Sequence, residues 1–136
     1  MTRVYVASPF RGANREETRQ NIVYARLCML DSLGRGESPY LSHLLITQVF
    51  AETPELREVG LGAGDAWRDA AQIVAAYTDL GTTPGMNRAL LAAAHRNTAS
   101  ATRLVTLSKG ETPTTPEAWR AYLATVPLVG FPELHR

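Results

Sequence analysis

Residues 73–78 read Ile-Val-Ala-Ala-Tyr-Thr, a continuous apolar run rich in strand-forming residues. A strand that is covered on both faces shows such a run instead of alternating apolar and polar residues, and such strands are typical of parallel sheets. The turn-rich sequence Asp-Leu-Gly-Thr-Thr-Pro-Gly follows at residues 79–85, and residues 86–94 have the Ala/Leu content of a helix. This stretch therefore predicts a central strand, a polar loop and a helix.

The first 35 residues predict the same order of elements. Residues 4–7, Val-Tyr-Val-Ala, are rich in strand formers, and the turn formers Ser8 and Gly12 come soon after them. Asn14 lies three residues before Glu17, which is the spacing of a capping box at a helix N-terminus. Helical spacing of apolar residues then continues for about 20 residues. The segment is typical of the opening of a βαβ unit.

The remaining segments continue the alternation. Residues 39–43 predict a second strand or its end, whereas residues 44–50 suit either a strand or a helix. A helix is predicted from Pro54 to about residue 71, a strand over 102–107 and a helix over 117–124. Strands that alternate with helices form a parallel sheet covered on both faces. We therefore predict an α/β fold, a three-layer sandwich with a mainly parallel sheet of four or five strands.

Length and composition favour one globular domain over residues 1–136. The chain is 45% apolar and 20% charged, which argues against disorder. Its one cysteine, Cys28, excludes a disulfide framework and a Cys-based zinc site. No apolar run approaches the roughly 20 residues that a membrane span needs, and the N-terminus lacks the pattern of a signal peptide. We expect a cytoplasmic protein that does not contact a membrane.

The charge balance argues against a nucleic-acid polymer as partner. The formal net charge is +1, so no overall field attracts DNA or RNA. Lys109 is the only lysine among the 14 basic residues, and the abundance of arginine fits the codon usage of a GC-rich genome. A role in bidentate phosphate binding is assigned to one or two arginines at most.

Three polar loops are predicted to meet at one edge of the sheet. In open α/β sheets, ligands bind beyond the carboxyl ends of the strands, near a switch in strand order. The loops at residues 8–14, 42–43 and 79–87 should lie at that edge. They contain most of the polar residues that could bind a ligand or take part in a reaction. Their convergence predicts a site for a small molecule.

The first loop, Ser-Pro-Phe-Arg-Gly-Ala-Asn, is a candidate anion site. It brings the hydroxyl of Ser8, the guanidinium of Arg11 and the backbone of Gly12 to the start of a helix, where unpaired N–H groups favour an anion. Phe10 is placed where it could stack on a ring. The alternative is a tight turn with a surface arginine. The chain contains neither a Walker loop nor a Gly-x-Gly-x-x-Gly pattern.

The third loop is a second candidate. Thr82, Thr83 and the backbone of Gly85 and Met86 could hold a sugar or a phosphate at the start of the next helix. The alternative is an ordinary loop in which Asp79 forms the turn.

His43 is a candidate general base or hydrogen-bond donor, or else a structural histidine at a strand end. His95 and His135 are predicted on the surface. No group of histidines and carboxylates has metal-ligand spacing, so we predict neither a metal nor another cofactor. A Gly-x-Ser-x-Gly elbow is absent from the sequence, which argues against a Ser-His-Asp triad. Tyr5, Phe10, Tyr40 and Trp67 are predicted in the core in preference to a base-stacking platform, although the loop position of Phe10 also allows stacking.

Residues 5–15, Tyr-Val-Ala-Ser-Pro-Phe-Arg-Gly-Ala-Asn-Arg, resemble the opening of the nucleoside 2-deoxyribosyltransferase superfamily, in particular its 2-deoxynucleoside 5-phosphate N-hydrolases and CMP N-glycosidases. Residues 65–77 resemble that family's next helix and strand, and Gly85 with Met86 resembles its Gly-Met-Glu turn. The resemblance covers about residues 3–107. It implies a flavodoxin-like sheet, a ligand loop that includes Tyr5, a nucleotide phosphate held by the first loop, and a homo-oligomer that completes the site.

The same resemblance implies cleavage or exchange of an N-glycosidic bond by a carboxylate that attacks the sugar. This sequence departs from the pattern at both carboxylate positions. Asn87 stands where the family has its nucleophilic glutamate, and Gly64 stands at the other position, with Asp65 next to it. A neutral amide cannot form the glycosyl ester.

Three hypotheses remain open. In the first hypothesis, the chain is an N-glycosidase or transferase whose carboxylate is Asp65, Asp69 or Asp79. In the second, it binds a nucleoside or nucleotide without turnover, as a sensor or sequestering protein. In the third, it is a structural domain that has lost its site. Release of free base from nucleosides and their monophosphates distinguishes the first from the other two.

Overall fold

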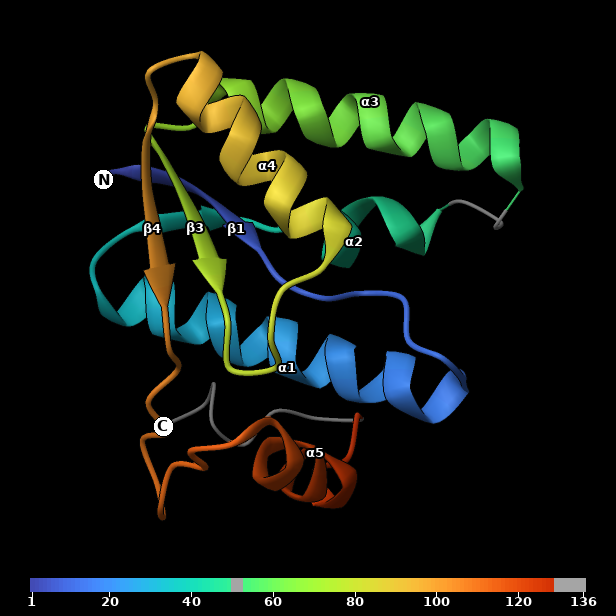
Figure 1. The fold of residues 1–136 in the computed structure, drawn as a ribbon, viewed down its shortest axis with the longest axis vertical. Coiled ribbons are helices and arrows are strands. Elements are labelled where there is room, and N and C mark those ends of the chain that lie inside the picture. Colours follow the sequence, from blue (N-terminus) through green and yellow to red (C-terminus); the bar gives the residue numbers. More distant parts are fainter. Residues whose placement is uncertain (50–52, 129–136) are drawn as a thin grey trace.

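The computed structural model describes residues 1–49 and 53–128 and has an α/β fold in three layers (Figure 1). Four parallel strands form one sheet in the order β2-β1-β3-β4. The strands are β1 (Arg3–Ala7), β2 (Ser38–Tyr40), β3 (Ile73–Tyr77) and β4 (Ala99–Arg103). The helical elements are α1 (Arg15–Gly34), α2 (Ser42–Leu45), the 3-10 turn η1 (Ile46–Gln48), α3 (Pro54–Ala70), α4 (Pro84–His95) and α5 (Pro116–Thr125). The predicted class, layers and parallel sheet are confirmed.

Local sequence accounts for where the helices begin. Asn14 caps α1, and its side chain accepts a hydrogen bond from the backbone N–H of Glu17, as the capping box predicts. Thr53, Thr83 and Thr115 cap α3, α4 and α5 in the same way, each followed by a proline in the first turn. These caps satisfy N–H groups that the first turn of a helix leaves without partners.

The structure decides one open prediction, and it shows that the predicted bounds of one strand are wrong. Of the segment 44–50, which suits either a strand or a helix, residues 44–48 are helical and Val49 is a turn residue, while Phe50 lies outside the described residues. The last strand was predicted over 102–107, but β4 begins at Ala99 and ends at Arg103. Its register explains the difference: Ala99 pairs with Ile73 and Arg103 with Tyr77, so the small residues at 99–101 occupy the strand.

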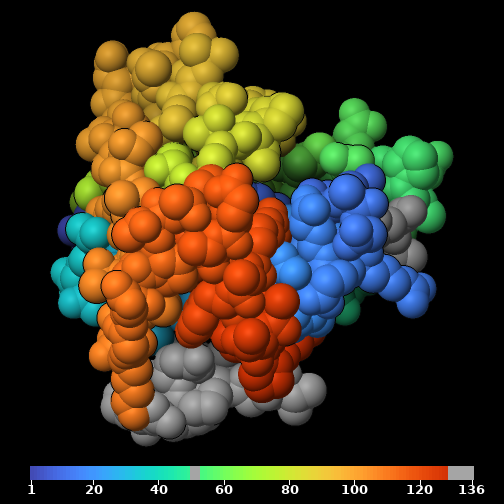
Figure 2. Space-filling view, turned by 60° about the horizontal axis from the view of Figure 1, so that its bottom comes forward, coloured from blue at the N-terminus to red at the C-terminus, as the bar shows by residue number. Residues whose placement is uncertain are grey.

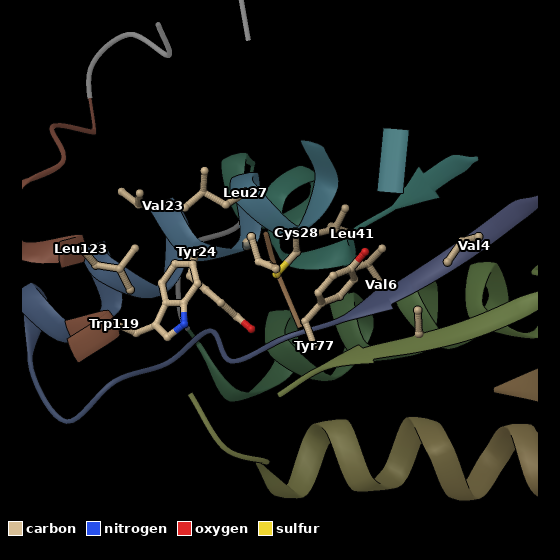
Figure 3. Close-up of a cluster of buried hydrophobic side chains, with 13 residues drawn as sticks. Val4, Val6, Val23, Tyr24, Leu27, Cys28, Leu41, Tyr77, Trp119 and Leu123 are labelled. Atoms are coloured by element: carbon tan, nitrogen blue, oxygen red, sulfur yellow. The ribbon is translucent and has the colours of Figure 1, made fainter. Parts of the chain in front are cut away.

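The larger core lies between the sheet and the pair α1 and α5. Figure 3 shows Tyr24 and Trp119 side by side, and their rings meet edge to face with centroids 5.6 Å apart. Cys28 is fully buried in this core. Figure 2 shows α5 against the N-terminal half of α1, where Arg19 donates hydrogen bonds to the backbone oxygens of Leu123 and Val126.

A smaller core lies under α4 on the other face of the sheet, and it consists mostly of small side chains: Ala7, Val74, Ala76, Met86, Ala89 and Ala93. The neighbouring helix α3 is different, because Gly64 is its one buried residue. Trp67, predicted in the core, is therefore 57% exposed, and its ring stacks on that of Tyr40. In the described part of the chain, no helix is long and apolar enough to cross a membrane.

Candidate functional site

A cavity of about 810 Å³ lies at the carboxyl edge of the sheet. The strand order places β1 between β2 and β3, so the connections that leave β1 and β3 run in opposite directions. This is the switch point at which open α/β sheets bind ligands. Residues of all three predicted loops line the cavity, including Ser8, His43 and Thr83. The structure thus brings the loops together as the sequence predicted.

Most candidate ligand-binding residues line this cavity. The lining includes Tyr5, Ser8, Phe10, Arg11, His43, Thr83, Gly85 and Met86. Gly12 and Thr82 are not part of it. The N–H of Gly12 donates instead to Thr18 Oγ1 at 2.9 Å, because the loop folds back onto the first turn of α1. That close approach requires a glycine, since a Cβ at this position would lie 2.5 Å from Glu17 Cβ.

The four candidate carboxylate or amide positions, Asp65, Asp69, Asp79 and Asn87, lie outside the cavity lining. Asp65 forms an ion pair with Arg68 of the same helix at 2.8 Å, and Asn87 is exposed to solvent on α4. Asp69 pairs with Arg68 as well, at 3.1 Å.

Asp79 is buried and hydrogen-bonded within the large core. Its Oδ2 accepts hydrogen bonds from the hydroxyl of Tyr24 at 2.6 Å and from the N–H of Val105 at 2.9 Å. The N–H of Asp79 donates to the Tyr24 hydroxyl at 3.1 Å. Because these bonds join α1, the end of β3 and the segment after β4, Asp79 connects the elements of the large core.

Gly64 is the residue of α3 that packs against α2, although Leu56, Arg57, Gly60 and Leu61 are the residues of α3 that line the cavity. A Cβ there would lie 3.0 Å from Ser42 Cβ and 4.0 Å from the hydroxyl of Tyr5. The absence of a side chain at Gly64 is therefore what lets α3 approach α2 closely. Asp65, one residue later, points away toward Arg68.

The cavity is lined by five arginines: Arg11, Arg15, Arg19, Arg57 and Arg88. Arg19 is paired with Glu16 at 2.7 Å, and this pairing holds the pKa of Glu16 at about 2. Within residues 1–49 and 53–128, no ion pair engages Arg15, Arg57 or Arg88. None of the described lining residues is an aspartate or a glutamate. The described lining therefore has an excess of positive charge, to which Arg15, Arg57 and Arg88 contribute without a described ion-pair partner.

Of these five arginines, only Arg11 is predicted from the sequence to bind a ligand. Arg15, Arg57 and Arg88 lie among the first five residues of α1, α3 and α4, and these helix starts bring them to the cavity. A signal was present, because each arginine lies within five residues of a predicted helix start. It could not be separated from the general abundance of arginine in this chain.

Ser8 and His43 form a direct contact on the cavity wall. Ser8 Oγ lies 3.1 Å from His43 Nε2, and the ring of Phe10 stacks on the imidazole with centroids 5.3 Å apart. Burial disfavours the charged imidazolium, so the pKa of His43 falls from its usual 6.5 to about 4. The imidazole is therefore neutral at pH 7.

These features define an α/β protein with a Rossmann-like sheet and a basic cavity at the switch point between β1 and β3. The chain belongs to the family described as Domain of unknown function (DUF7768), whose model matches residues 2–104. The match includes all four strands and α1 to α4, but not α5. A search of curated proteins gives no match.

Proposed function

We propose that this protein binds an organic phosphate of the nucleoside 5-phosphate type in the cavity between β1 and β3. The observation that supports the proposal is the lining of five arginines without a described carboxylate. Guanidinium groups bind phosphate with paired, charge-assisted hydrogen bonds. The net charge of the whole chain is only +1, so the arginines of the cavity are a local concentration of positive charge.

The rest of the cavity suits the apolar part of such a ligand. Its volume lies in the range of about 300–1,000 Å³ that is usual for small-molecule sites. Apolar side chains complete the lining: Ala7, Phe10, Ile22, Ile46, Leu56, Leu61, Met86, Ala89 and Leu128. A flat, weakly polar base can pack against these walls while its phosphate meets the arginines.

The start of α4 is better suited to the phosphate than the start of α1. The first turn of α1 contains Glu16 and Glu17, whose charges oppose an anion. The first turn of α4 contains no acidic residue, and its Gly85 and Met86 line the cavity together with Arg88. We therefore place the phosphate near Arg88.

The same lining favours binding over cleavage of the glycosidic bond. A retaining glycosidase needs a carboxylate beside the anomeric carbon, and the described lining provides none. We expect no release of free base when the protein is incubated with nucleosides or their 5-monophosphates. Base release that is lost in Asp65→Asn or Asp69→Asn would instead support the glycosidase hypothesis.

Calorimetric titration with nucleosides and with their 5-monophosphates tests the proposal. We expect the monophosphates to bind more tightly, and Arg88→Ala to weaken their binding by about ten- to a hundredfold, which corresponds to the roughly 1.5–3 kcal/mol of a charged hydrogen bond. Arg96→Ala is the matched control, because Arg96 follows the same helix but does not line the cavity. Equal binding of nucleoside and monophosphate, or equal effects of the two variants, would refute the phosphate site.

A homo-oligomer remains a prediction. Light scattering at micromolar concentration checks it, and a monomer throughout that range would contradict it.

A further inference from the structure

Ser8 and His43 reach each other from two different strand ends. Ser8 directly follows β1, and His43 lies in α2, directly after β2. Their contact of 3.1 Å between Oγ and Nε2 is within the distance at which a base can take the proton of a serine hydroxyl. Both residues line the arginine-rich cavity, where 7% of Ser8 is exposed.

The state of His43 suits it to accept that proton. Its imidazole is neutral at pH 7, because burial lowers its pKa. In the tautomer with the proton on Nδ1, Nε2 is the acceptor for the Ser8 hydroxyl. The Phe10 ring, stacked on the imidazole, holds it in position. A phosphate dianion in the cavity would favour the imidazolium form and so assist the transfer.

The surroundings match the charge that a phosphoryl group develops when it is transferred. Catalysis of that reaction consists mostly of positioning and of neutralising the oxygen atoms around phosphorus. Arg11 follows Ser8 by three residues in the same loop, and Arg88 enters the cavity from α4. The cavity thus combines a hydroxyl, a neutral base and several cations.

We propose that Ser8 and His43 form a nucleophile and general base that accept the phosphoryl group of a phosphate monoester. The hydroxyl oxygen of Ser8 attacks phosphorus, and its proton moves to His43 Nε2. The bond between phosphorus and the ester oxygen breaks, and the imidazolium returns the proton to that oxygen, so the alcohol leaves neutral. Ser8 is left as phosphoserine.

A water molecule completes the cycle. His43 takes a proton from the water as its oxygen attacks phosphorus, the bond from phosphorus to Ser8 Oγ breaks, and the imidazolium protonates that oxygen. Inorganic phosphate and free Ser8 are the products. The kind of substrate rests on the proposed function, whereas the reactivity of Ser8 toward phosphorus does not.

The test uses the intact protein and a simple alkyl fluorophosphonate that contains no nucleoside. Ser8 should displace fluoride and gain the phosphonyl group, which peptide mass spectrometry locates. Ser8→Ala should abolish the adduct, and His43→Gln should slow its formation by about a hundredfold, the low end of general-base effects. Ser108→Ala, which changes an exposed serine outside the cavity, should react like the parent protein.

A second measurement addresses the substrate class. The protein should release p-nitrophenolate from p-nitrophenyl phosphate, and acid quenching should trap phosphoserine at residue 8. An unlabelled parent protein, labelling at another residue, or parent-like labelling of a folded His43→Gln variant would each overturn the proposal. Labelling of Ser8 by the fluorophosphonate needs no nucleotide, so the two proposals can fail separately. If Ser8 is labelled but the protein binds no nucleotide, only the proposed function is refuted. If the protein binds a nucleotide but Ser8 is not labelled, only the assignment of Ser8 as nucleophile is refuted.

Discussion

Asp79→Asn tests whether Asp79 acts in the core or in catalysis. The substitution keeps the size of the side chain but removes its charge. In the parent protein, one carboxylate oxygen accepts hydrogen bonds from the Tyr24 hydroxyl and the Val105 N–H, and the residue is only 8% exposed. In the variant, both bonds become neutral. The buried environment also has to accommodate an amide N–H₂ group.

The structure sets the size of the effect. A hydrogen bond to a charged group stabilises by about 1.5–3 kcal/mol and a neutral one by about 0.5–1.5 kcal/mol, so the loss is about 1 kcal/mol for each bond. Together with the cost of the buried amide, unfolding should become easier by about 2–3 kcal/mol. For a domain of this length, that corresponds to a fall in Tm of about 6–12 °C.

Thermal unfolding followed by circular dichroism measures this change, and calorimetry with a nucleoside monophosphate measures binding in the folded variant. We expect a lower Tm and nearly unchanged affinity. Asp65→Asn is the control, because its ion pair with Arg68 is partly exposed and worth about 1 kcal/mol or less. A parent-like Tm in Asp79→Asn, accompanied by loss of binding or turnover, would refute the structural role.

Two further predictions concern packing and pH. Gly64→Ala should lower Tm and speed hydrogen exchange in α3, because the new Cβ would lie 3.0 Å from Ser42 Cβ. The control Gly62→Ala, whose Cβ would have no atom within 4 Å, should instead stabilise the helix by about 0.5–1 kcal/mol. Equal effects of the two variants would contradict the close approach of α3 to α2 at Gly64. Glu37→Gln should destabilise the protein at pH 7 by about 2–3 kcal/mol, because two hydrogen bonds of 2.7 Å from Arg103 hold the pKa of Glu37 below its usual 4.5. The stabilisation by the ionised Glu37 is complete above pH 4.5 and is lost as the pH falls through the lowered pKa. The free energies of unfolding of parent and variant, measured by urea titration, should therefore converge in acid. A constant difference between them from pH 7 to pH 3 would refute the role of the Glu37 charge.

The positions of most elements follow from the sequence, because their determinants are local. The run at 73–78 forms the central strand β3, and the pair Asn14 and Glu17 begins α1 as its spacing predicts. The meeting of the three loops also follows from sequence, since parallel strands all end at one edge. The boundaries of β4 do not, because the edge strand takes its register from β3 and not from its own apolar content.

The roles of individual site residues were decided only by the tertiary structure. Asp79 lies in a polar loop sequence, yet its side chain is part of the core, because it accepts a hydrogen bond from Tyr24, which is 55 residues away in the sequence. Ser8 and His43 are separated by 35 residues and meet because β1 and β2 are neighbours in the sheet. Local patterns specify where a strand ends. Which side chains then share a hydrogen bond or a cavity depends on the order in which strands pair and on how closely helices approach, and those distances exist only in the folded chain.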